Sequence, residues 1–227
     1  MSDKPNAQSL AFVPPSVAQD LGPSDEDLAR ADLYGLMSEL FLAPASDDLF
    51  NRLAASPAPQ EEDTNDLERA WRSLLQAAQS RNPQEVVAEY NELFVAVGKP
   101  LVALHASVFI TGAMNQRPLV AIREDLARLG LEASPEGGDT EDHIAALCEV
   151  MRYLIASPEA LGSTLPEQQQ FFASHLQPWV SQLCDAIRAQ PKSHFYAAVA
   201  DLAQAFFTVE QQGFDIYAAS LDAMERS

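Results

Sequence analysis

Apolar side chains recur at intervals of three and four residues along most of this chain. The first such stretch follows Ser24, and its apolar residues are Leu28, Leu33, Leu36, Met37, Leu40 and Phe41. This spacing places them on one face of a helix, and a serine directly before the stretch is a typical N-cap. No stretch alternates with a period of two, and no Asn-Gly or Asp-Gly hairpin signal occurs. The sequence therefore predicts an all-α fold.

Prolines, glycines and capping residues divide this pattern into about eight to ten helices. Thr64 and Thr140 precede two periodic stretches as expected N-caps, and Pro83 and Pro118 suit the first turns of two more helices. Long patterns run near 165–189 and 193–211, and a last helix is expected over about 214–225. Pro178 should begin or kink the second half of the first of these patterns. The sequence thus predicts a series of short and medium helices.

The expected domain organisation is simple. Residues 1–23 contain four prolines and no periodicity, which predicts a flexible N-terminal tail. Residues 24–227 are long enough for a single globular helical domain with a substantial core. The turn-rich segment near 131–140 is a possible subdivision of that domain.

Composition limits the partners and the compartment. The chain has 33 acidic and 14 basic side chains, a formal net charge of −19. This charge repels phosphate backbones, so no nucleic-acid partner is expected, whereas a basic partner would be attracted. Cys148 and Cys184 lie in helical patterns and are expected to be buried thiols in a reducing compartment. No secretion signal and no apolar run of membrane-spanning length is recognisable, which predicts a cytoplasmic protein without stable membrane insertion.

Motifs for catalysis or cofactor binding are missing from the sequence. It contains no Glu-x-x-His, no His-Glu-x-x-His and no cysteine pairs at zinc spacing. It also contains no glycine-rich phosphate loop and no Gly-x-Ser-x-Gly. We therefore expect no metal, no cofactor and no catalytic nucleophile.

Asp142 and His143 form the most conspicuous polar pair, because they are expected in the first turn of a helix. The simplest interpretation is an acid that favours the helix dipole beside a partly exposed histidine. The functional interpretation is that the pair grips cationic or amide groups of a peptide. Arg123 is either part of a solvated charged face or orients Asp142 through an ion pair.

Tyr90, Leu93 and Phe94 follow one another at helical spacing. They are either core residues of a helix or one apolar wall of a peptide-binding groove. In the second case Tyr90 would add a hydroxyl where an apolar segment meets polar backbone.

Several elements, taken in order over about residues 28–212, resemble the TorD/DmsD family of redox-enzyme maturation chaperones. An aromatic-x-x-Leu-Phe element is followed by a proline, serine, aromatic and glycine stretch, then Asp-His with a later acid, then Phe-x-x-x-His-Leu-x-Pro-Trp, then Phe-Tyr. The matching residues are Tyr90, Leu93, Phe94, Pro100, Ser107, Phe109, Gly112, Asp142, His143, Glu149, Phe172, His175, Leu176, Pro178, Trp179, Phe195 and Tyr196. The family often has proline before Asp-His, whereas this chain has Glu141.

The resemblance implies an all-helical cytoplasmic chaperone, monomeric or a domain-swapped dimer. Its partners would be the twin-arginine leader peptide and the precursor of a molybdopterin oxidoreductase subunit, held until cofactor loading is complete. The residues expected to contact the peptide are Tyr90, Leu93, Phe94, Ser107, Arg123, Asp142 and His143.

Two other functions remain open on the sequence. One is a hydrolase-like helical enzyme that uses Asp142 and His143 as an acid–base pair, although no nucleophile or metal accompanies them. The other is a helical regulator that binds a small ligand, for which no basic DNA-reading helix is recognisable.

Overall fold

The computed structural model describes residues 23–57, 65–95, 99–132, 139–157 and 164–225. The tail predicted over 1–23 lies outside these residues except for Pro23, as does most of the segment 131–140. Within the described residues the fold is all-α, as predicted, with ten helices and no named strand. The helices are α1 (Asp25–Leu42), α2 (Asp47–Ala55), α3 (Asp66–Gln79), α4 (Pro83–Phe94), α5 (Ala106–Thr111), α6 (Arg117–Arg128), α7 (Ile144–Ala156), α8 (Leu165–His175), α9 (Val180–Arg188) and α10 (Phe195–Glu225).

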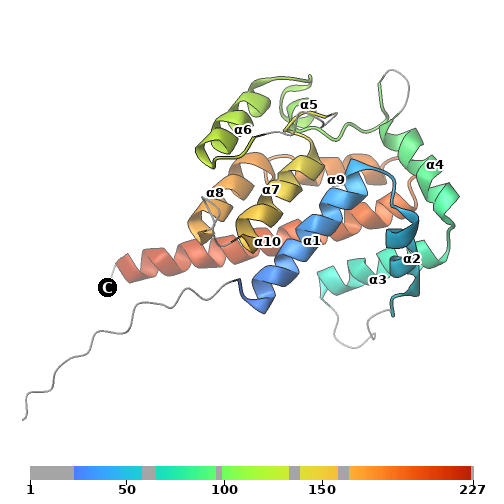
Figure 1. Cartoon of the computed structure of the whole chain (residues 1–227), viewed down its shortest axis with the longest axis horizontal. Helices are drawn as coiled ribbons and strands as arrows, with labels where there is room; N and C mark the ends of the chain where they lie inside the picture. Colours follow the sequence, from blue (N-terminus) through green and yellow to red (C-terminus); the bar gives the residue numbers. More distant parts are fainter. Residues whose placement is uncertain (1–22, 58–64, 96–98, 133–138, 158–163, 226–227) are drawn as a thin grey trace, which may run out of the picture.

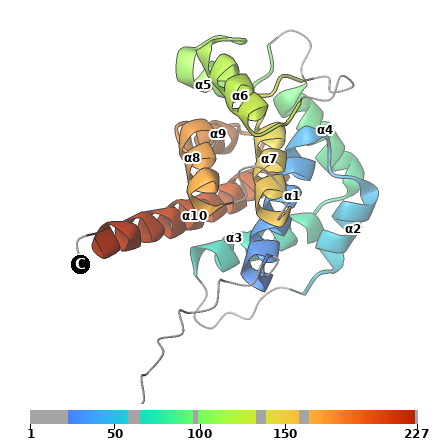
Figure 2. The ribbon, with the colours of Figure 1, turned by 60° about the vertical axis from the view of Figure 1, so that its left-hand side comes forward.

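Helix α10 is the axis of the molecule. It crosses behind α1 and α7, which pack side by side, and it contacts α3, α4 and α9 along its length (Figures 1 and 2). Helices α5 and α6 contact each other and sit at one edge of this assembly. In both views the C-terminal end of α10 projects beyond α8.

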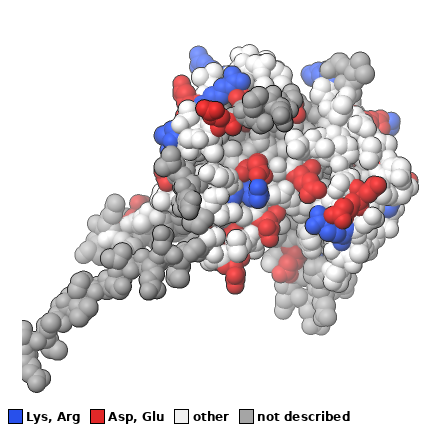
Figure 3. Space-filling view, in the orientation of Figure 1, with Lys and Arg blue, Asp and Glu red and all other residues white. Residues whose placement is uncertain are grey.

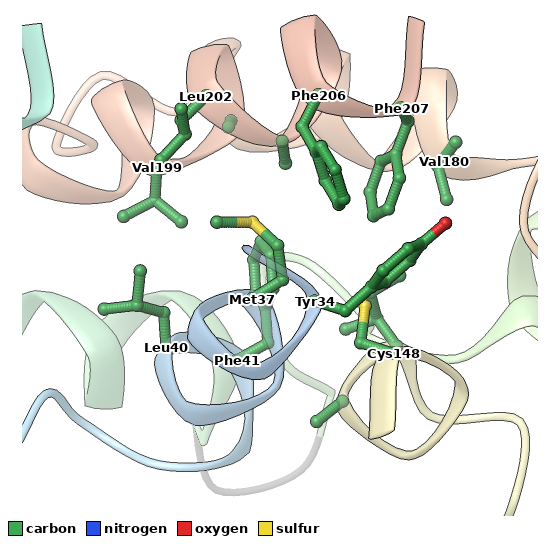
Figure 4. Close-up of a cluster of buried hydrophobic side chains, with 14 of the residues drawn as sticks. Tyr34, Met37, Leu40, Phe41, Cys148, Val180, Val199, Leu202, Phe206 and Phe207 are labelled. Carbon is green, nitrogen blue, oxygen red and sulfur yellow. The ribbon is translucent and has the colours of Figure 1, made fainter. Parts of the chain in front are cut away.

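The core lies between α1, α7 and α10 (Figure 4). Tyr34, Met37 and Phe41 of α1 are fully buried, and Phe206 of α10 meets the Tyr34 ring edge-on at 4.8 Å between centroids. Cys148 of α7 lies in the same cluster as a free thiol, and burial strongly raises its pKa. A chain of this size buries enough apolar surface for such a core to hold the helices together.

Local signals predicted many helix starts correctly. Ser24 caps α1 in a capping box with Asp27, and Pro83 occupies the first turn of α4. The predicted cap Thr64 lies outside the described residues, and Asn65 caps α3.

One expectation for the C-terminal helices was confirmed and one was wrong. The long pattern near 165–189 divides at 176–179 into α8 and α9, where Pro178 was expected to begin or kink its second half. The helices expected over 193–211 and 214–225, by contrast, are one helix of 31 residues. Gly213 does not interrupt it, because Phe214 is buried and packs on Phe172 at 5.4 Å between ring centroids.

Glu89 of α4 secures the start of α10. Its carboxylate accepts hydrogen bonds from the backbone N–H groups of His194, Phe195 and Tyr196 at 2.8, 3.1 and 2.8 Å. A carboxylate at this end of a helix satisfies otherwise unpaired N–H groups and suits the helix dipole. Glu89 thereby fixes α4, which carries Tyr90 and Phe94, against the central helix.

None of the described helices is both long enough and apolar enough to cross a membrane.

Candidate functional site

Two short segments pair where the sequence analysis placed its polar residues. The N–H of Ile144 donates to the carbonyl of Leu104, and the N–H of Ala106 donates to the carbonyl of Asp142, each at 2.9 Å. His105 and His143 thus face each other across an isolated antiparallel bridge. Their rings meet edge-on at 4.9 Å between centroids. The bridge joins the starts of α5 and α7, so both histidines have fixed positions.

The cap of α7 differs from the prediction. His143, rather than Thr140, is the N-cap, and Asp142 precedes the helix instead of lying in its first turn. The reason is that extended backbone is needed at His143 for the bridge to Leu104 and Ala106. The Thr140 side chain donates its hydroxyl to Asp142 instead of capping a helix.

Asp142 is fully buried, with no exposed surface. Its carboxylate accepts the backbone N–H of Ser107 at 3.0 Å and the hydroxyl of Thr140. Burial alone would raise the pKa of Asp142, but these hydrogen bonds outweigh it and hold the pKa below its usual value. Asp142 therefore joins the start of α5 to the start of α7. Ser107 is equally buried, and its Oγ accepts the N–H of Gln116 at 3.4 Å.

His143 is held in its neutral form. Its Nδ1 accepts the N–H of Ala145 at 3.2 Å, which leaves the ring proton on Nε2. Burial, together with the neighbouring His105, lowers the pKa of His143 to about 4. At neutral pH this side chain is therefore an uncharged donor.

Arg123 makes an ion pair, but with Glu141 and not with Asp142 as hypothesised. Its Nε and Nη2 each lie 2.9 Å from a carboxylate oxygen of Glu141. The Asp142 side chain points inward to Ser107, so the half-buried Glu141 is the partner that Arg123 can reach. This pairing lowers the pKa of Glu141.

Two of the three apolar candidates of α4 belong to the core. Leu93 and Tyr90 are buried, whereas Phe94 is half-buried. Tyr90 and Phe94 also line a hollow. The rings of Tyr90 and Phe94 meet at 5.1 Å between centroids, and both pack against Tyr196. The Tyr90 hydroxyl donates to the carbonyl of Phe41 at 3.1 Å. Tyr90 thus presents its ring rather than its hydroxyl.

We call the space beside Tyr90 and Phe94 the apolar hollow. It has a volume of about 910 Å³ and lies between α4, α5 and the segment 99–105. Besides Tyr90 and Phe94, the residues that shape it include Leu42, Leu101, Leu104, His105, Val108, Phe109, Met114, Asp139 and His143. Phe109 stacks on the buried Trp179 at 5.5 Å between ring centroids, which supports this wall from behind.

A second space, which we call the acidic hollow, adjoins it on the other side of His143. Its volume is about 450 Å³. Its walls come mainly from α7 and the segments 131–132 and 139–141, and they include Leu126, Leu131, Glu132, Asp139, Glu141, Glu149, Val150 and Tyr153. Leu42, Asp139 and His143 line both hollows. The two spaces are therefore parts of one groove.

The groove also contains three side chains that could approach a metal ion. Ligand atoms of His105, Asp139 and His143 all lie within 4.8 Å of one another. Sequence spacing does not reveal this group, because His105 lies more than thirty positions before Asp139 and His143. Coordination through Nε2 of His143 would require its proton to move to Nδ1, which accepts the Ala145 N–H. The hydrogen bonding thus favours a polar cluster over a metal site.

On the face shown in Figure 3, the charged side chains are dispersed. Acidic and basic side chains lie there in small mixed groups, with acidic ones more numerous. Many are local ion pairs, such as Arg152 with Glu149 in α7. No basic patch suited to nucleic acid appears among the described residues of that face.

Sequence reasoning missed several residues of the groove. Leu42, Leu101, Val108, Met114 and Asp139 were not singled out, although four of them are exposed or half-buried apolar residues. Three of these five residues lie in segment 100–116, which contains no charged side chain. This absence of charge was the feature of the sequence that could have indicated an apolar wall of the groove. His175, by contrast, is structural: it bonds Asp125 through Nε2 at 2.7 Å, and its carbonyl accepts the Trp179 indole N–H.

Comparison with known proteins supplies the family. Residues 60–185, more than half of the chain, match the family model described as nitrate reductase delta subunit. A chaperone protein TorD from Vibrio cholerae serotype O1 is 25% identical over 202 residues, which cover 82% of this chain and 92% of the relative. A chaperone protein TorD from Shewanella loihica is 24% identical over 80% of this chain and 91% of the relative.

A solved structure confirms the fold. The crystal structure of a protein from Archaeoglobus fulgidus, described as a redox enzyme maturation protein, superposes with a TM-score of 0.51. The two chains are 15% identical, and the match covers 76% of this chain and 91% of the other. The helical arrangement is therefore shared despite a very different sequence.

Proposed function

Since the chain belongs to the TorD-like family of nitrate reductase delta subunits, which are redox-enzyme maturation chaperones and not enzymes, we propose that it binds a twin-arginine leader. In this proposal the leader belongs to the precursor of a molybdoenzyme catalytic subunit. Binding in the cytoplasm shields the leader while the precursor folds and receives its cofactor, before export or assembly. Whether the chaperone acts as a monomer or as a domain-swapped dimer stays a prediction.

The observation that carries the proposal is the groove. Such a leader has a basic end followed by an apolar segment of about ten residues. The apolar hollow offers aromatic and aliphatic walls from Tyr90, Phe94 and Val108, and carboxylates line the space beside it. Apolar burial would provide most of the affinity, and the acidic groups would favour the basic end.

The candidate residues then have different roles. Phe94 is half-buried, and Tyr90 and His143 are buried side chains that border the groove; all three are proposed to contact the peptide. Leu93, Ser107 and Asp142 are buried and are proposed to hold the groove in shape. Arg123 acts through Glu141, which it orients at the edge of the acidic hollow.

The test is calorimetric titration with a synthetic twin-arginine leader. Leu101→Asp introduces a charge into the apolar hollow at a side chain that is 54% exposed, so the fold should tolerate it. We expect the affinity to fall at least about tenfold, because burying an unpaired carboxylate costs more than 1.4 kcal/mol.

The matched control is Val120→Asp. Val120 is 56% exposed on α6 and lines neither hollow. Its substitution should leave the affinity within a factor of two of the wild type. Equal losses in both variants, or no loss in either, would place the peptide elsewhere.

The hydrolase alternative receives no support from the geometry. Asp142 is buried and bonds Ser107 and Thr140, and no hydrogen bond among the described residues joins it to the His143 ring. A histidine whose pKa is lowered to about 4 is also a weak base at neutral pH.

A further inference from the structure

We propose that the leader crosses both hollows in one direction, with its arginine pair in the acidic hollow and its apolar segment in the apolar hollow. This inference rests on the proposed function and adds the position and polarity of the bound peptide. Continuity of the groove is its first support. Leu42, Asp139 and His143 border both hollows, so an extended peptide passes from one to the other at these side chains.

The carboxylates of the acidic hollow are the second support. Four line it, of which Glu141 pairs with Arg123 and Glu149 pairs with Arg152. Glu132 forms no ion pair with another described residue, and the neighbour of Asp139 is His105 at 3.7 Å. Two carboxylates therefore remain available for two cations, and both are exposed.

A ring in the same hollow favours arginine over lysine. Tyr153 is 39% exposed and lines the acidic hollow beside the half-buried Val150. A guanidinium group can stack on such a ring while donating two parallel hydrogen bonds to a carboxylate. An ammonium group lacks this planar geometry, so a lysine pair should bind less well.

The apolar hollow is unsuited to the arginine pair. Among its described lining residues, Asp139 at the boundary is the carboxylate, and Lys99 adds a cation of its own. The buried Asp142, which the sequence suggested as the receiver of an arginine, lines neither hollow. The distribution of charged side chains therefore favours this orientation over its reverse.

The first experiment is a double-mutant cycle by calorimetry. The probe is a synthetic peptide with two adjacent arginines before an apolar run of about ten residues. Its variants replace the arginines by lysines, or place one aspartate in the apolar run. The protein variants are Glu132→Gln with Asp139→Asn for the acidic hollow, and Leu101→Asp for the apolar hollow.

We expect Glu132→Gln with Asp139→Asn to weaken binding of the arginine peptide about tenfold and to abolish its preference over the lysine peptide. The same double variant should leave the penalty for aspartate in the apolar run unchanged. Leu101→Asp should show the opposite pattern, with the arginine preference retained. The control Glu124→Gln with Asp215→Asn removes the same charge at exposed residues that line neither hollow, and should change the affinity less than twofold.

The second experiment determines the direction of the bound peptide in the groove without a measurement of affinity. A photo-crosslinking benzophenone side chain replaces Tyr153 in one variant and Leu101 in another, both exposed positions in opposite hollows. Mass spectrometry of the adducts should place the Tyr153 crosslink at or next to the arginine pair. The Leu101 crosslink should fall within the apolar run.

Outcomes separate this inference from the proposed function. Binding by the wild type with crosslinks in the reverse order, or with no coupling between the acidic hollow and the arginine pair, would overturn the orientation alone. Failure of the wild type to bind any such peptide would overturn the proposed function and the orientation together.

Discussion

At the scale of single residues, the structure separates contact from support. Asp142 and His143 are neighbours in sequence, yet one is enclosed by Ser107 and Thr140 while the other borders both hollows. The difference arises from the bridge to Leu104 and Ala106, which turns alternate side chains to opposite sides. If a substitution of Asp142 impairs function, the direct cause would therefore be disruption of the local structure rather than loss of a contact with the peptide.

The lowered pKa of His143 makes stability depend on pH. The unfolded chain takes up a proton near pH 6.5, whereas the folded ring does so near pH 4, so the stabilisation is present above pH 6.5 and is lost as pH falls toward 4. Between pH 7 and pH 5, we expect the free energy of unfolding of the wild type to fall by about 2 kcal/mol more than that of His143→Gln. Urea unfolding at both pH values measures this difference. The titratable groups whose charges act on the pKa of His143 are His105, Asp139 and Asp142.

His194→Gln is the matched control, because His194 is exposed. This variant should follow the wild type at both pH values. A His143→Gln profile parallel to the wild type would mean that the ring takes up its proton in the folded state without cost.

At the scale of elements, α10 departs most from expectation. Separate helices were expected over 193–211 and 214–225, and glycine is unfavourable inside helices, yet α10 continues through Gly213. Burial of Phe214 against Phe172, and of Glu210 beside Arg30 and Tyr34, holds both sides of Gly213 to the same body. Tertiary packing therefore outweighs a local preference of about 1 kcal/mol.

Gly213→Ala tests the continuity of α10. An added Cβ would meet nothing within 4 Å, so the variant should raise the free energy of unfolding by about 0.5–1 kcal/mol. Chemical denaturation followed by circular dichroism measures it. Gly112→Ala is the contrasting variant, because Gly112 has a φ of 80° at the end of α5. An alanine there is strained, so the free energy of unfolding should fall by about 1 kcal/mol. Destabilisation by Gly213→Ala would argue for a bend at that residue.

At the scale of the whole molecule, the net charge of −19 affects the rate at which a leader associates more than the rate at which it dissociates. It attracts a basic leader from solution, while apolar burial in the groove retains it. The same charge opposes close approach of a second copy, so any dimer must offset this repulsion by other contacts.

Salt should therefore weaken leader binding without abolishing it. Raising the ionic strength from about 0.05 to about 0.5 M should reduce the association rate at least about tenfold, with a smaller effect on dissociation. Stopped-flow fluorescence with a labelled leader separates the two rates. A leader with glutamines in place of the arginines should show little salt dependence, and equal dependence for both peptides would contradict electrostatic steering of the arginine pair.

The sequence by itself determined the helical class and most helix starts, because those depend on the spacing of apolar residues and on caps such as Ser24 and Pro83. It also led to the family, since ordered motifs survive in the chain even where identity is low. These properties are local, or are sums over local signals.

Tertiary structure alone decided how the site is built. The groove forms where α1, α4, α5 and α7 meet. Of the residues that border both hollows, Leu42 lies about one hundred positions before Asp139 and His143 in the sequence, so only folding brings it beside them. Whether Tyr90 shows a ring or a hydroxyl depended on the carbonyl of Phe41, and whether α10 continued past Gly213 depended on Phe172. Such outcomes depend on contacts between distant segments, and the spacing of residues along the sequence does not indicate those contacts.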